Sequence, residues 1–362
     1  MKKIEINIPQ NEYNVYLGNN IFADILNLLK RENFYQDFLL VIDKNVNECY
    51  SKLVDSAFST SEKKVEKIII ESSEKKKNFD SVQKIHSKLI ANNFGRDSII
   101  VAIGGGIIGD VAGFAASTYM RGIKYVQIPT TLLASVDSSV GGKTGINFEH
   151  TKNIIGTFYQ PKLVLIDTHF FKTLPEDEII CGLGEIVKYA FLIDKSFFNF
   201  VKNNIEEILS NDSKTINKVI SNSVKFKGSV VTADEKESGI RKILNLGHTF
   251  AHAFEVQQNH KLKHGQAVIV GITCSLYLSK KMNLIDKKSF NEYLKFLIQF
   301  SGKIKLAKVD NEIIYNIMQK DKKNRDNKIK LVLLQNVGSI LTDIYIEHQL
   351  IIQSINEAIV HF

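Results

Sequence analysis

The stretch IIVAIGGGIIGD, residues 99–110, runs from an apolar segment directly into three consecutive glycines. The apolar part predicts a buried strand, because short apolar runs bounded by glycine are typical of strands in parallel sheets. Glycines at 104–106 let the backbone turn sharply into a helix and leave its first N–H groups available to hold an anion. The segment therefore predicts a strand–turn–helix unit with an anion-binding turn.

A second polar stretch, IPTTLLASVDSSVGGKTGIN at residues 128–147, follows this unit. Asp110 lies near the start of the expected helix, and Lys143 and Lys152 lie downstream of it. An acidic side chain and basic side chains can therefore contact the same ligand. We expect a nucleotide site here, adjoining a second, anionic substrate.

The glycine turn matches the pattern GxGxxG, which alone is a weak indication of a dinucleotide site. A dinucleotide site also needs an acidic residue at the end of the next strand, to bind the ribose. The next strand, YVQI at 125–128, is followed by Pro129 and two threonines, and the nearest suitable acid is Asp43 on an earlier strand. A standard dehydrogenase domain is therefore disfavoured. In the simplest alternative, the glycines only let a helix approach the sheet closely.

Apolar segments of strand length alternate with helical patterns through the first half of the chain. Strands are expected at 4–8, 13–17, 38–43, 65–70, 98–103, 125–128 and 163–167, and helices at 21–31, 79–93 and 109–120. This alternation predicts a parallel sheet covered by helices. We expect an α/β nucleotide-binding domain over residues 1–175, Rossmann-like but with an atypical strand order.

The pattern becomes helical after Leu174. Thr173, Pro175 and Glu176 resemble the start of a helix with a capping box. The apolar spacing then stays mostly helical to about residue 320, before a short strand pair and a last helix at 346–360. We expect a second, mainly α-helical domain over residues 176–362.

The composition limits the class of protein. Lys and Arg exceed Asp and Glu by 47 to 39, but the lysines are spread along the chain, which disfavours a nucleic-acid partner. Three widely spaced cysteines, at 49, 181 and 274, fit neither a disulfide framework nor a cysteine metal site. No apolar run has the length of a membrane span, and the first residues lack the pattern of a signal peptide. We expect a cytoplasmic protein without a nucleic-acid or membrane partner.

The second half contains NLGHTFAHAFE, residues 245–255, followed by His264. His248 and His252 are four residues apart, so on a helix they share one face. Glu185, in GLGEIVKY, lies on an otherwise apolar helix, where a carboxylate needs a partner. Two histidines and one carboxylate can form a catalytic metal site with an open position, and such a cation polarises a hydroxyl or carbonyl oxygen. Spacing leaves open which two histidines are ligands, and whether each is structural instead.

Basic residues also gather near these segments, although most lysines are simply solvated. Lys188 and Arg241 differ because apolar residues surround them. Lys188 follows Glu185 by three residues and so lies on the same helical face. The other basic residues of this group are Arg121, Lys143, Lys152, Lys227, Lys322 and Lys323.

Together these blocks resemble the 3-dehydroquinate synthase family of the sugar phosphate cyclase superfamily. The resemblance covers nearly the whole chain and rests on GGGIIGDVAGFAAS, IPTTLLASVDSSVGGKTGIN, KNIIGTFYQP, GLGEIVKY, DEKESGIRKILNLGHTFAHAFE and HGQAV. It implies an enzyme of the shikimate pathway of aromatic amino-acid biosynthesis, a phosphate-eliminating carbon–oxygen lyase. The implied reaction converts 3-deoxy-D-arabino-heptulosonate 7-phosphate to 3-dehydroquinate and phosphate. Its steps are transient oxidation by NAD, phosphate elimination, reduction and intramolecular aldol closure.

The resemblance also implies roles for individual residues. One divalent metal, zinc or cobalt, is expected on Glu185, His248 and His264. NAD contacts are expected from Asp43, Glu74, Lys77, Gly105, Gly106, Ile107, Ile108, Gly109, Asp110, Thr130, Thr131, Asp137, Lys143, Lys152, Phe170, Phe171, Lys172 and Thr173. Contacts to a small anionic sugar-phosphate substrate are expected from Arg121, Lys143, Asn153, Lys188, Lys227, Arg241, Asn245 and His252, with one lysine of the 322–323 pair. The family is commonly a homodimer, in which Arg121 reaches the site of the partner subunit.

The chain departs from the family pattern at a few positions. Gly184 stands where alanine or serine is usual, and we expect the added helix flexibility to be tolerated. Ala251 stands where glycine is usual, and we expect little consequence. The segment 71–79, which holds Glu74 and Lys77, matches the family loosely.

Other functions fit parts of the pattern. Another sugar phosphate cyclase, of the deoxy-inosose synthase type, would share the fold, the metal and NAD, but Arg241 and Lys227 favour a substrate with a carboxylate. A metal-dependent polyol dehydrogenase of related fold would release NADH, and the block SSVGGKT argues against it. A non-catalytic binding protein would not need the set of Glu185, His248 and His264.

Overall fold

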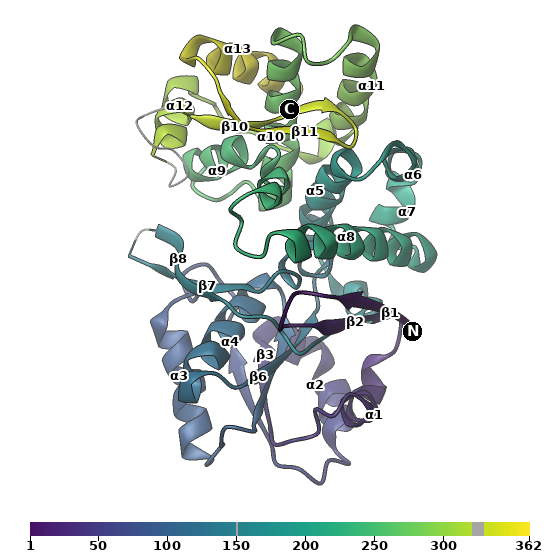
Figure 1. The fold of residues 1–362 in the computed structure, drawn as a ribbon, viewed down its shortest axis with the longest axis vertical. Coiled ribbons are helices and arrows are strands. Elements are labelled where there is room, and N and C mark those ends of the chain that lie inside the picture. The colour runs from purple at the N-terminus through teal and green to yellow at the C-terminus, as the bar shows by residue number, and fades with distance from the viewer. Residues whose placement is uncertain (150, 321–328) are drawn as a thin grey trace. The chain divides into compact units, whose positions relative to one another are not determined.

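A computed structural model describes residues 1–149, 151–320 and 329–362 of the chain (Figure 1). The chain forms two compact units. The first comprises Met1–Pro175 and Asn211–Lys236, and the second comprises Glu176–Ser210 and Glu237–Phe362. Lys322 and Lys323, one of which is expected to contact substrate, lie outside the described residues.

The first unit is built on a seven-stranded sheet in the order β1-β2-β9-β6-β5-β3-β4. β1 pairs antiparallel with β2, and the further neighbours described are parallel. The strands are β1 (Lys2–Ile6), β2 (Tyr13–Gly18), β3 (Phe38–Asp43), β4 (Val65–Ile70), β5 (Ile99–Gly104), β6 (Lys124–Pro129) and β9 (Leu163–Asp167). The predicted parallel sheet is therefore present, and every predicted strand of it overlaps an observed one.

Helices cover both faces of this sheet, because its buried strands carry apolar side chains on alternate sides. On one face, Leu39 and Val41 of β3 pack in a core with α3 (Phe79–Ala91) and α4 (Gly106–Thr118). On the other face, Phe38 meets Phe58 of α2 (Lys44–Phe58), with ring centroids 5.8 Å apart. The short helices η1 (Phe22–Asp24) and α1 (Ile25–Arg31) pack against α2.

The strand order explains why no acidic residue follows β6. The five parallel strands that begin with β3 lie in the sheet in the order β4-β3-β5-β6-β9. The chain therefore runs from β3 to β4 in one direction and from β5 to β9 in the other, and the order reverses between β3 and β5. Open α/β sheets bind ligands outside the carboxyl ends of their strands at such a reversal. Asp43 ends β3 and Gly104 ends β5, and these two strands are hydrogen-bonded neighbours. The expected Rossmann-like sheet of atypical order is confirmed.

Two parts of the first unit are absent from the sequence prediction. Helix α2 follows β3 without an intervening loop, because Asp43 ends the strand and also caps the helix through the N–H groups of Asn45 and Val46. The hairpin of β7 (Lys143–Phe148) and β8 (Thr151–Phe158) pairs Gly145 with Gly156, and β8 is largely exposed. Only the short segment Thr144–Ile146 of β7 is buried, so the hairpin shows little apolar alternation and sequence patterns do not reveal it.

Helix α8 (Ser213–Ala233) packs with the first unit, whereas the sequence groups its residues with the second domain. It contacts β1, β2, η3 (Ala134–Ser138) and η4 (Thr168–Thr173). The approach to β1 is close because Gly228 has no side chain; a Cβ there would lie 2.4 Å from Ile6 Cδ1. The first segment of the first unit ends at Pro175, where the sequence places the domain boundary. Because α8 belongs to the first unit, Lys227 does too.

The second unit is mainly helical, as expected. Its buried helix α10 (His264–Lys281) contacts α5 (Glu176–Leu192), α9 (His248–Gln257), α11 (Lys287–Leu297), α13 (His348–Ile359) and β10 (Lys330–Asn336). The other elements are α6 (Lys195–Asn203), α7 (Ile205–Leu209), η5 (Ile240–Asn245), η6 (Ile298–Lys303), α12 (Asn311–Gln319) and β11 (Ser339–Tyr345), which pairs with β10. In the described part of the chain, no helix is both long and apolar enough to cross a membrane.

Candidate functional site

The glycine turn between β5 and α4 leaves no room for side chains. A Cβ at Gly104 would lie 2.7 Å from Ile108 Cγ1, one at Gly105 3.1 Å from Thr131 Cγ2, and one at Gly106 3.0 Å from Ser138 Oγ. Gly105 caps α4 without a side-chain hydrogen bond. The N-terminus of α4 therefore presents backbone N–H groups and the positive end of a helix dipole, which suit a phosphate.

Asp43 lies beside this turn. Asp43 is buried, and a Cβ added to Gly104 would lie 3.1 Å from the Cβ of Asp43. Its Oδ1 accepts the two capping hydrogen bonds of α2, at 2.7 Å and 3.3 Å. The carboxylate is thus held at the carboxyl end of β3, where the predicted ribose contact requires it. Thr130, at the end of β6, donates its N–H to the Gly104 carbonyl.

Three predicted site residues meet at a buried lysine. Lys77 Nζ forms an ion pair with Asp110 and donates to Asn153 Oδ1 at 2.6 Å. Burial raises the pKa of the Asp110 carboxyl above its usual range, although the Lys77 ammonium opposes that shift. The ion pair between Lys77 and Asp110 therefore connects the loosely matched segment 71–79 to helix α4.

The same place gathers two more predicted residues around Asn147. The Asn147 amide donates to the Glu74 carboxylate at 2.7 Å, and its carbonyl accepts from the Asn153 N–H. Lys152 Nζ lies 4.0 Å from Glu74 Oε1. Glu74, Lys77, Asp110, Lys152 and Asn153 are therefore brought together, with Asn147 as a bridge that the sequence did not single out.

Asp137 and Lys227 form a second predicted pair in this unit. Asp137 lies in the π-helical turn η3, a rare kind of turn that is frequent at functional sites. Lys227 Nζ donates to the Asp137 backbone oxygen at 2.8 Å and lies 2.8 Å from its carboxylate. Helix α8 thus places the buried Lys227 ammonium against the middle of the second polar stretch.

The other predicted residues of the first unit contribute in different ways. Thr131 Oγ1 accepts from the Ala134 N–H, and Lys143 is exposed at the start of β7. Phe170 and Phe171 are buried in the core, so only their backbone is available to a ligand, whereas Lys172 and Thr173 are exposed. Arg121 is exposed and has a φ of +69°. Ile108 and Gly109 are buried within α4, and Ile107 is half-buried.

The second unit brings Glu185, His248 and His264 together; we call these three residues the inner set. Glu185 Oε1 lies 3.3 Å from the Nε2 atom of each histidine. The Lys188 ammonium forms an ion pair with Oε2, yet neither buried oxygen accepts a directed hydrogen bond. All three ligand atoms lie within 4.8 Å of one another. They come from the starts of α9 and α10 and the middle of α5.

Both histidines of the inner set are oriented through Nδ1. His248 Nδ1 lies 3.2 Å from the Leu246 carbonyl oxygen, and His264 Nδ1 lies 2.7 Å from Glu255 Oε1. In a neutral ring, an Nδ1–H that donates to oxygen leaves Nε2 with its lone pair, which is the form that binds a metal. The arrangement therefore presents both Nε2 atoms to Glu185.

The charges in this cluster are strongly coupled. Burial would raise the pKa of Glu185, but Lys188 and His248 hold it well below its usual range. Burial and Lys188 lower the pKa of His248 to about 4, so its ring is neutral at pH 7. Burial opposes charge on His264 too, but Glu185 and Glu255 raise its pKa to about 10. A divalent cation at this place would displace the His264 proton.

Two glycines allow the helices that carry Glu185 and His264 to touch. A Cβ on Gly184 would lie 2.1 Å from the Gly265 carbonyl oxygen, and one on Gly265 1.9 Å from the Cys181 carbonyl oxygen. Gly184 precedes Glu185, and Gly265 follows His264, so the close contact of α5 and α10 sets the separation of the two ligands. Gly184 is therefore a packing residue, and the expectation of harmless added flexibility misses this role.

We predict that Gly184→Ala destabilises the protein. Alanine gains about 1 kcal/mol of helix propensity over glycine, but overpacking costs about 1–3 kcal/mol. The clashing atoms belong to a backbone, which cannot rotate away as a side chain can, so we expect a net loss of about 1–2 kcal/mol. Denaturant unfolding measures it, with Gly302→Ala as the control because a Cβ there meets nothing within 4 Å. A Gly184→Ala protein more stable than the wild type would contradict the packing role.

Other predicted residues lie in the same unit as the inner set. Lys188 and Arg241 are buried. Asn245 donates to Glu237 Oε1 at 2.6 Å. His252 is partly exposed, with its Nδ1 3.4 Å from Glu255 Oε2. Glu237 and Glu255 are the residues of this unit that the sequence analysis missed; an acidic residue among apolar neighbours in AFEV was the available signal for Glu255.

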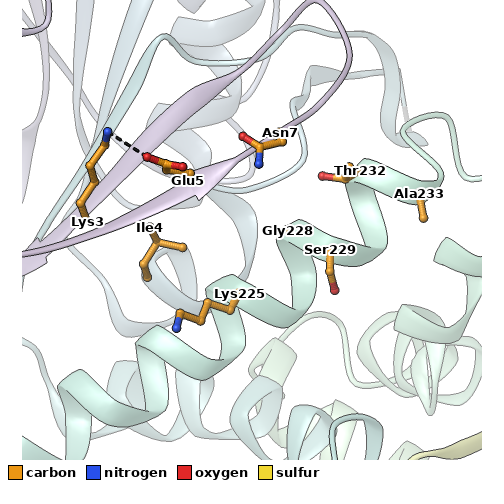
Figure 2. A pocket seen from close by; sticks show the side chains of 9 residues that line it. All are labelled: Lys3, Ile4, Glu5, Asn7, Lys225, Gly228, Ser229, Thr232 and Ala233. Atoms are coloured by element: carbon orange, nitrogen blue, oxygen red, sulfur yellow. Dashed lines mark ion pairs between the residues drawn. The ribbon is translucent and has the colours of Figure 1, made fainter.

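One pocket of the first unit lies apart from all these residues. It has a volume of about 610 Å³ and lies between β1 and α8 (Figure 2). Lys3 and Glu5 on one wall form an ion pair at 3.1 Å, and Lys225 and Ser229 line the other. None of the residues lining it is a predicted site residue.

Comparison with known proteins identifies relatives along most of the chain. Residues 67–181 match the family model described as 3-dehydroquinate synthase N-terminal, and residues 182–324 match the one described as 3-dehydroquinate synthase C-terminal. A 3-dehydroquinate synthase of Pelagibacter ubique is 44% identical over 344 residues, which is 93% of each chain.

Solved structures share the fold over nearly the full length. A 2-deoxy-scyllo-inosose synthase, complexed with carbaglucose-6-phosphate, NAD⁺ and Co²⁺, has a TM-score of 0.90 at 25% identity, covering 99% of this chain and 100% of that one. A 2-epi-5-epi-valiolone synthase from Streptomyces hygroscopicus has a TM-score of 0.84 at 24% identity, covering 96% of each chain. At that lower identity the likeness concerns the fold alone.

Proposed function

The chain belongs to the 3-dehydroquinate synthase family, and from this membership we propose how its residues carry out that family's reaction. The substrate is 3-deoxy-D-arabino-heptulosonate 7-phosphate, and the products are 3-dehydroquinate and phosphate. NAD and one divalent metal, zinc or cobalt, are the cofactors. The observation that carries the proposal is the inner set, Glu185, His248 and His264.

The inner set fits a divalent metal by its distances. With metal–ligand bonds of about 2.0–2.2 Å in a tetrahedral site, neighbouring ligand atoms lie about 3.4 Å apart. The two Nε2 atoms lie 3.3 Å from Glu185 Oε1, and this buried oxygen accepts no directed hydrogen bond. We assign the three residues as the ligands. When bound, the metal supplies a Lewis acid that polarises a substrate hydroxyl and lowers its pKa.

The first unit fits a dinucleotide by its glycine turn. Gly105 and Gly106 carry no side chains that would cover the first N–H groups of α4, which suits this helix start to a phosphate. Asp43 is held at the adjacent strand end, where a ribose hydroxyl can donate to it. We assign the pyrophosphate to this turn and the remaining predicted NAD contacts to the residues around Lys77 and Asp137.

The basic residues bind the anionic groups of the substrate. A guanidinium can hold a carboxylate or phosphate through two parallel hydrogen bonds, so we assign Arg241 to one of these groups. Lys188 and Lys227 are buried, and each faces a carboxylate, that of Glu185 or that of Asp137. Phosphate elimination and aldol closure are intramolecular, so these residues act mainly by orientation. His252 is assigned to substrate contact and proton transfer.

The competing cyclase function differs in its substrate. An enzyme of the deoxy-inosose synthase type acts on a sugar phosphate without a carboxylate, whereas the Arg241 guanidinium suits a substrate that carries one. We expect phosphate release from the heptulosonate phosphate and none from glucose 6-phosphate, measured with NAD⁺ and Zn²⁺ or Co²⁺. We also expect a chelator to stop the release and added metal to restore it. Turnover of glucose 6-phosphate alone would overturn the substrate assignment.

We further propose that the enzyme is a carbon–oxygen lyase that works as a cytoplasmic homodimer. Support comes from the family resemblance and from Arg121, which is exposed with a φ of +69° next to the exposed Met120. Light scattering after size-exclusion chromatography measures the assembly. A monomer under assay conditions would contradict the dimer and the proposed role of Arg121 at the partner's site.

A further inference from the structure

Glu255 stands behind the inner set and faces two histidines at once. It lies on α9 and is 6% exposed, on a helix whose other buried residues are apolar or small. Its Oε1 lies 2.7 Å from His264 Nδ1, and its Oε2 lies 3.4 Å from His252 Nδ1. Both oxygens of one buried carboxylate are therefore occupied by imidazole nitrogens. We call His252, Glu255 and His264 the outer set.

The contact with His264 defines which ring nitrogen faces the inner set. A neutral imidazole carries one proton, and the carboxylate accepts a hydrogen bond only from the nitrogen that bears it. With the proton on Nδ1, the lone pair of His264 lies on Nε2, which points to Glu185. A carboxylate behind a ligating histidine also makes the ring a stronger ligand.

The contact of Glu255 with His252 likewise defines the tautomer of the His252 ring, although His252 does not belong to the inner set. His252 and His264 are stacked, with ring centroids 6.0 Å apart and an interplanar angle of 27°. A proton on His252 Nδ1, directed at Glu255, leaves its Nε2 as the nitrogen available to accept or donate a proton. One carboxylate can thus hold both rings in the same tautomer.

The outer set could instead bind a second cation, since its ligand atoms also lie within 4.8 Å of one another. Its distances argue otherwise. A separation of 2.7 Å between His264 Nδ1 and Glu255 Oε1 is that of a charge-assisted hydrogen bond. Two ligands of one tetrahedral metal lie about 3.4 Å apart, which the inner set matches and this pair does not.

We propose that Glu255 is a positioning residue that fixes the tautomers of His264 and His252, so that the outer set holds protons and the inner set holds the single metal. The proposal rests on the proposed ligand set. It assigns no direct contact with the reacting atoms to Glu255. Its effect is on how tightly the metal binds and on the reactive nitrogen that His252 presents.

Glu255→Gln tests the proposal because an amide keeps the shape but has only one acceptor oxygen. Glutamine can accept from one imidazole and must direct its NH₂ group at the other, which breaks one of the two contacts. We expect zinc affinity to fall by about 10–100-fold, as for other partners of ligating histidines. Competition with a chromophoric chelator measures it. The Co²⁺ absorption bands should change in position or intensity, and kcat should fall more than KM rises.

Glu312→Gln is the matched control, because Glu312 accepts from His348 Nε2 at 3.0 Å on the exposed surface of the same unit. It should leave zinc affinity and the Co²⁺ spectrum unchanged. Glu255→Ala provides a second variant, expected to lose at least as much affinity as Glu255→Gln. Wild-type zinc affinity and an unchanged Co²⁺ spectrum in Glu255→Gln would overturn the proposal.

Metal stoichiometry separates this proposal from the proposed function. We expect one equivalent of Zn²⁺ per chain in the wild type and one in His252→Gln. Two equivalents, with the second lost in His252→Gln, would show that the outer set is a metal site and would overturn the positioning role. No metal bound by the wild type would instead contradict the inner set itself.

Discussion

His264→Ala is expected to lose tight metal binding and to lower kcat by at least about 1,000-fold. His264 Nε2 is one of three atoms around Glu185, and its removal leaves the carboxylate with a single imidazole. A metal that polarises the reacting oxygen contributes several kcal/mol to the transition state. About 4 kcal/mol corresponds to this loss of rate. Metal analysis after dialysis and phosphate release measure the two effects.

A surface histidine serves as the control for this substitution. His348 also pairs with a carboxylate, but it is exposed and lies on α13. His348→Ala should keep one metal per chain and wild-type turnover. A His264→Ala protein that is fully active and replete with metal would refute the ligand assignment.

Lys77→Met is expected to produce the second large effect, on stability and on NAD binding together. The substitution leaves Asp110 without the ammonium that balances its burial. Breaking a buried ion pair costs about 3–5 kcal/mol, and we expect the lower value because Asp110 is partly exposed. Asn153 loses a donor at the same time. We therefore expect weaker NAD⁺ binding by at least about tenfold, since the loop and α4 no longer hold together.

Denaturant unfolding and NAD⁺ titration measure these two effects separately. Lys76→Met is the control, because Lys76 is exposed one position earlier and should change neither quantity. In Lys77→Met with Asp110→Asn, the lost stability should partly return because no buried charge remains, while NAD⁺ binding stays weak. Wild-type NAD⁺ affinity in Lys77→Met would contradict the place of this residue at the nucleotide.

The sequence predicts the centre of the sheet well because β3, β5 and β9 are buried on both faces. Continuous apolar runs such as FLLVID and IIVAI are hard to interpret in another way when glycine or proline bounds them. The missing acid after YVQI was also informative. It pointed to Asp43 and so to an unusual strand order, which the structure explains by the reversal between β3 and β5.

Features that depend on contacts far along the chain are beyond such patterns. Helix α8 has the spacing of any amphipathic helix, and only the absence of a side chain at Gly228 relates it to β1. Gly184 resembles a flexible point until Gly265 is seen against it. The pairing of Lys77 with Asp110 joins residues 33 positions apart, and Glu255 acquires its role from His264 on the next helix.

The candidate metal site was likewise predictable only in part from the sequence. Residue types and spacing indicated a metal near Glu185 and the three histidines, but could not separate the ligands from the remaining histidine. The distances favour His248 and His264 as ligands, because the Nε2 atom of each lies 3.3 Å from Glu185 Oε1, whereas the described ion pair of His252 is with Glu255.

Counting NAD turnover tests most directly whether the chain oxidises its substrate only transiently. Purified protein with Zn²⁺ or Co²⁺ receives excess heptulosonate phosphate and NAD⁺ at about one equivalent per active site. We predict that phosphate release continues through many turnovers, with no NADH accumulating at 340 nm. Release that stops after one phosphate per NAD⁺, with one NADH formed for each, would contradict the cyclase mechanism and would instead indicate a dehydrogenase.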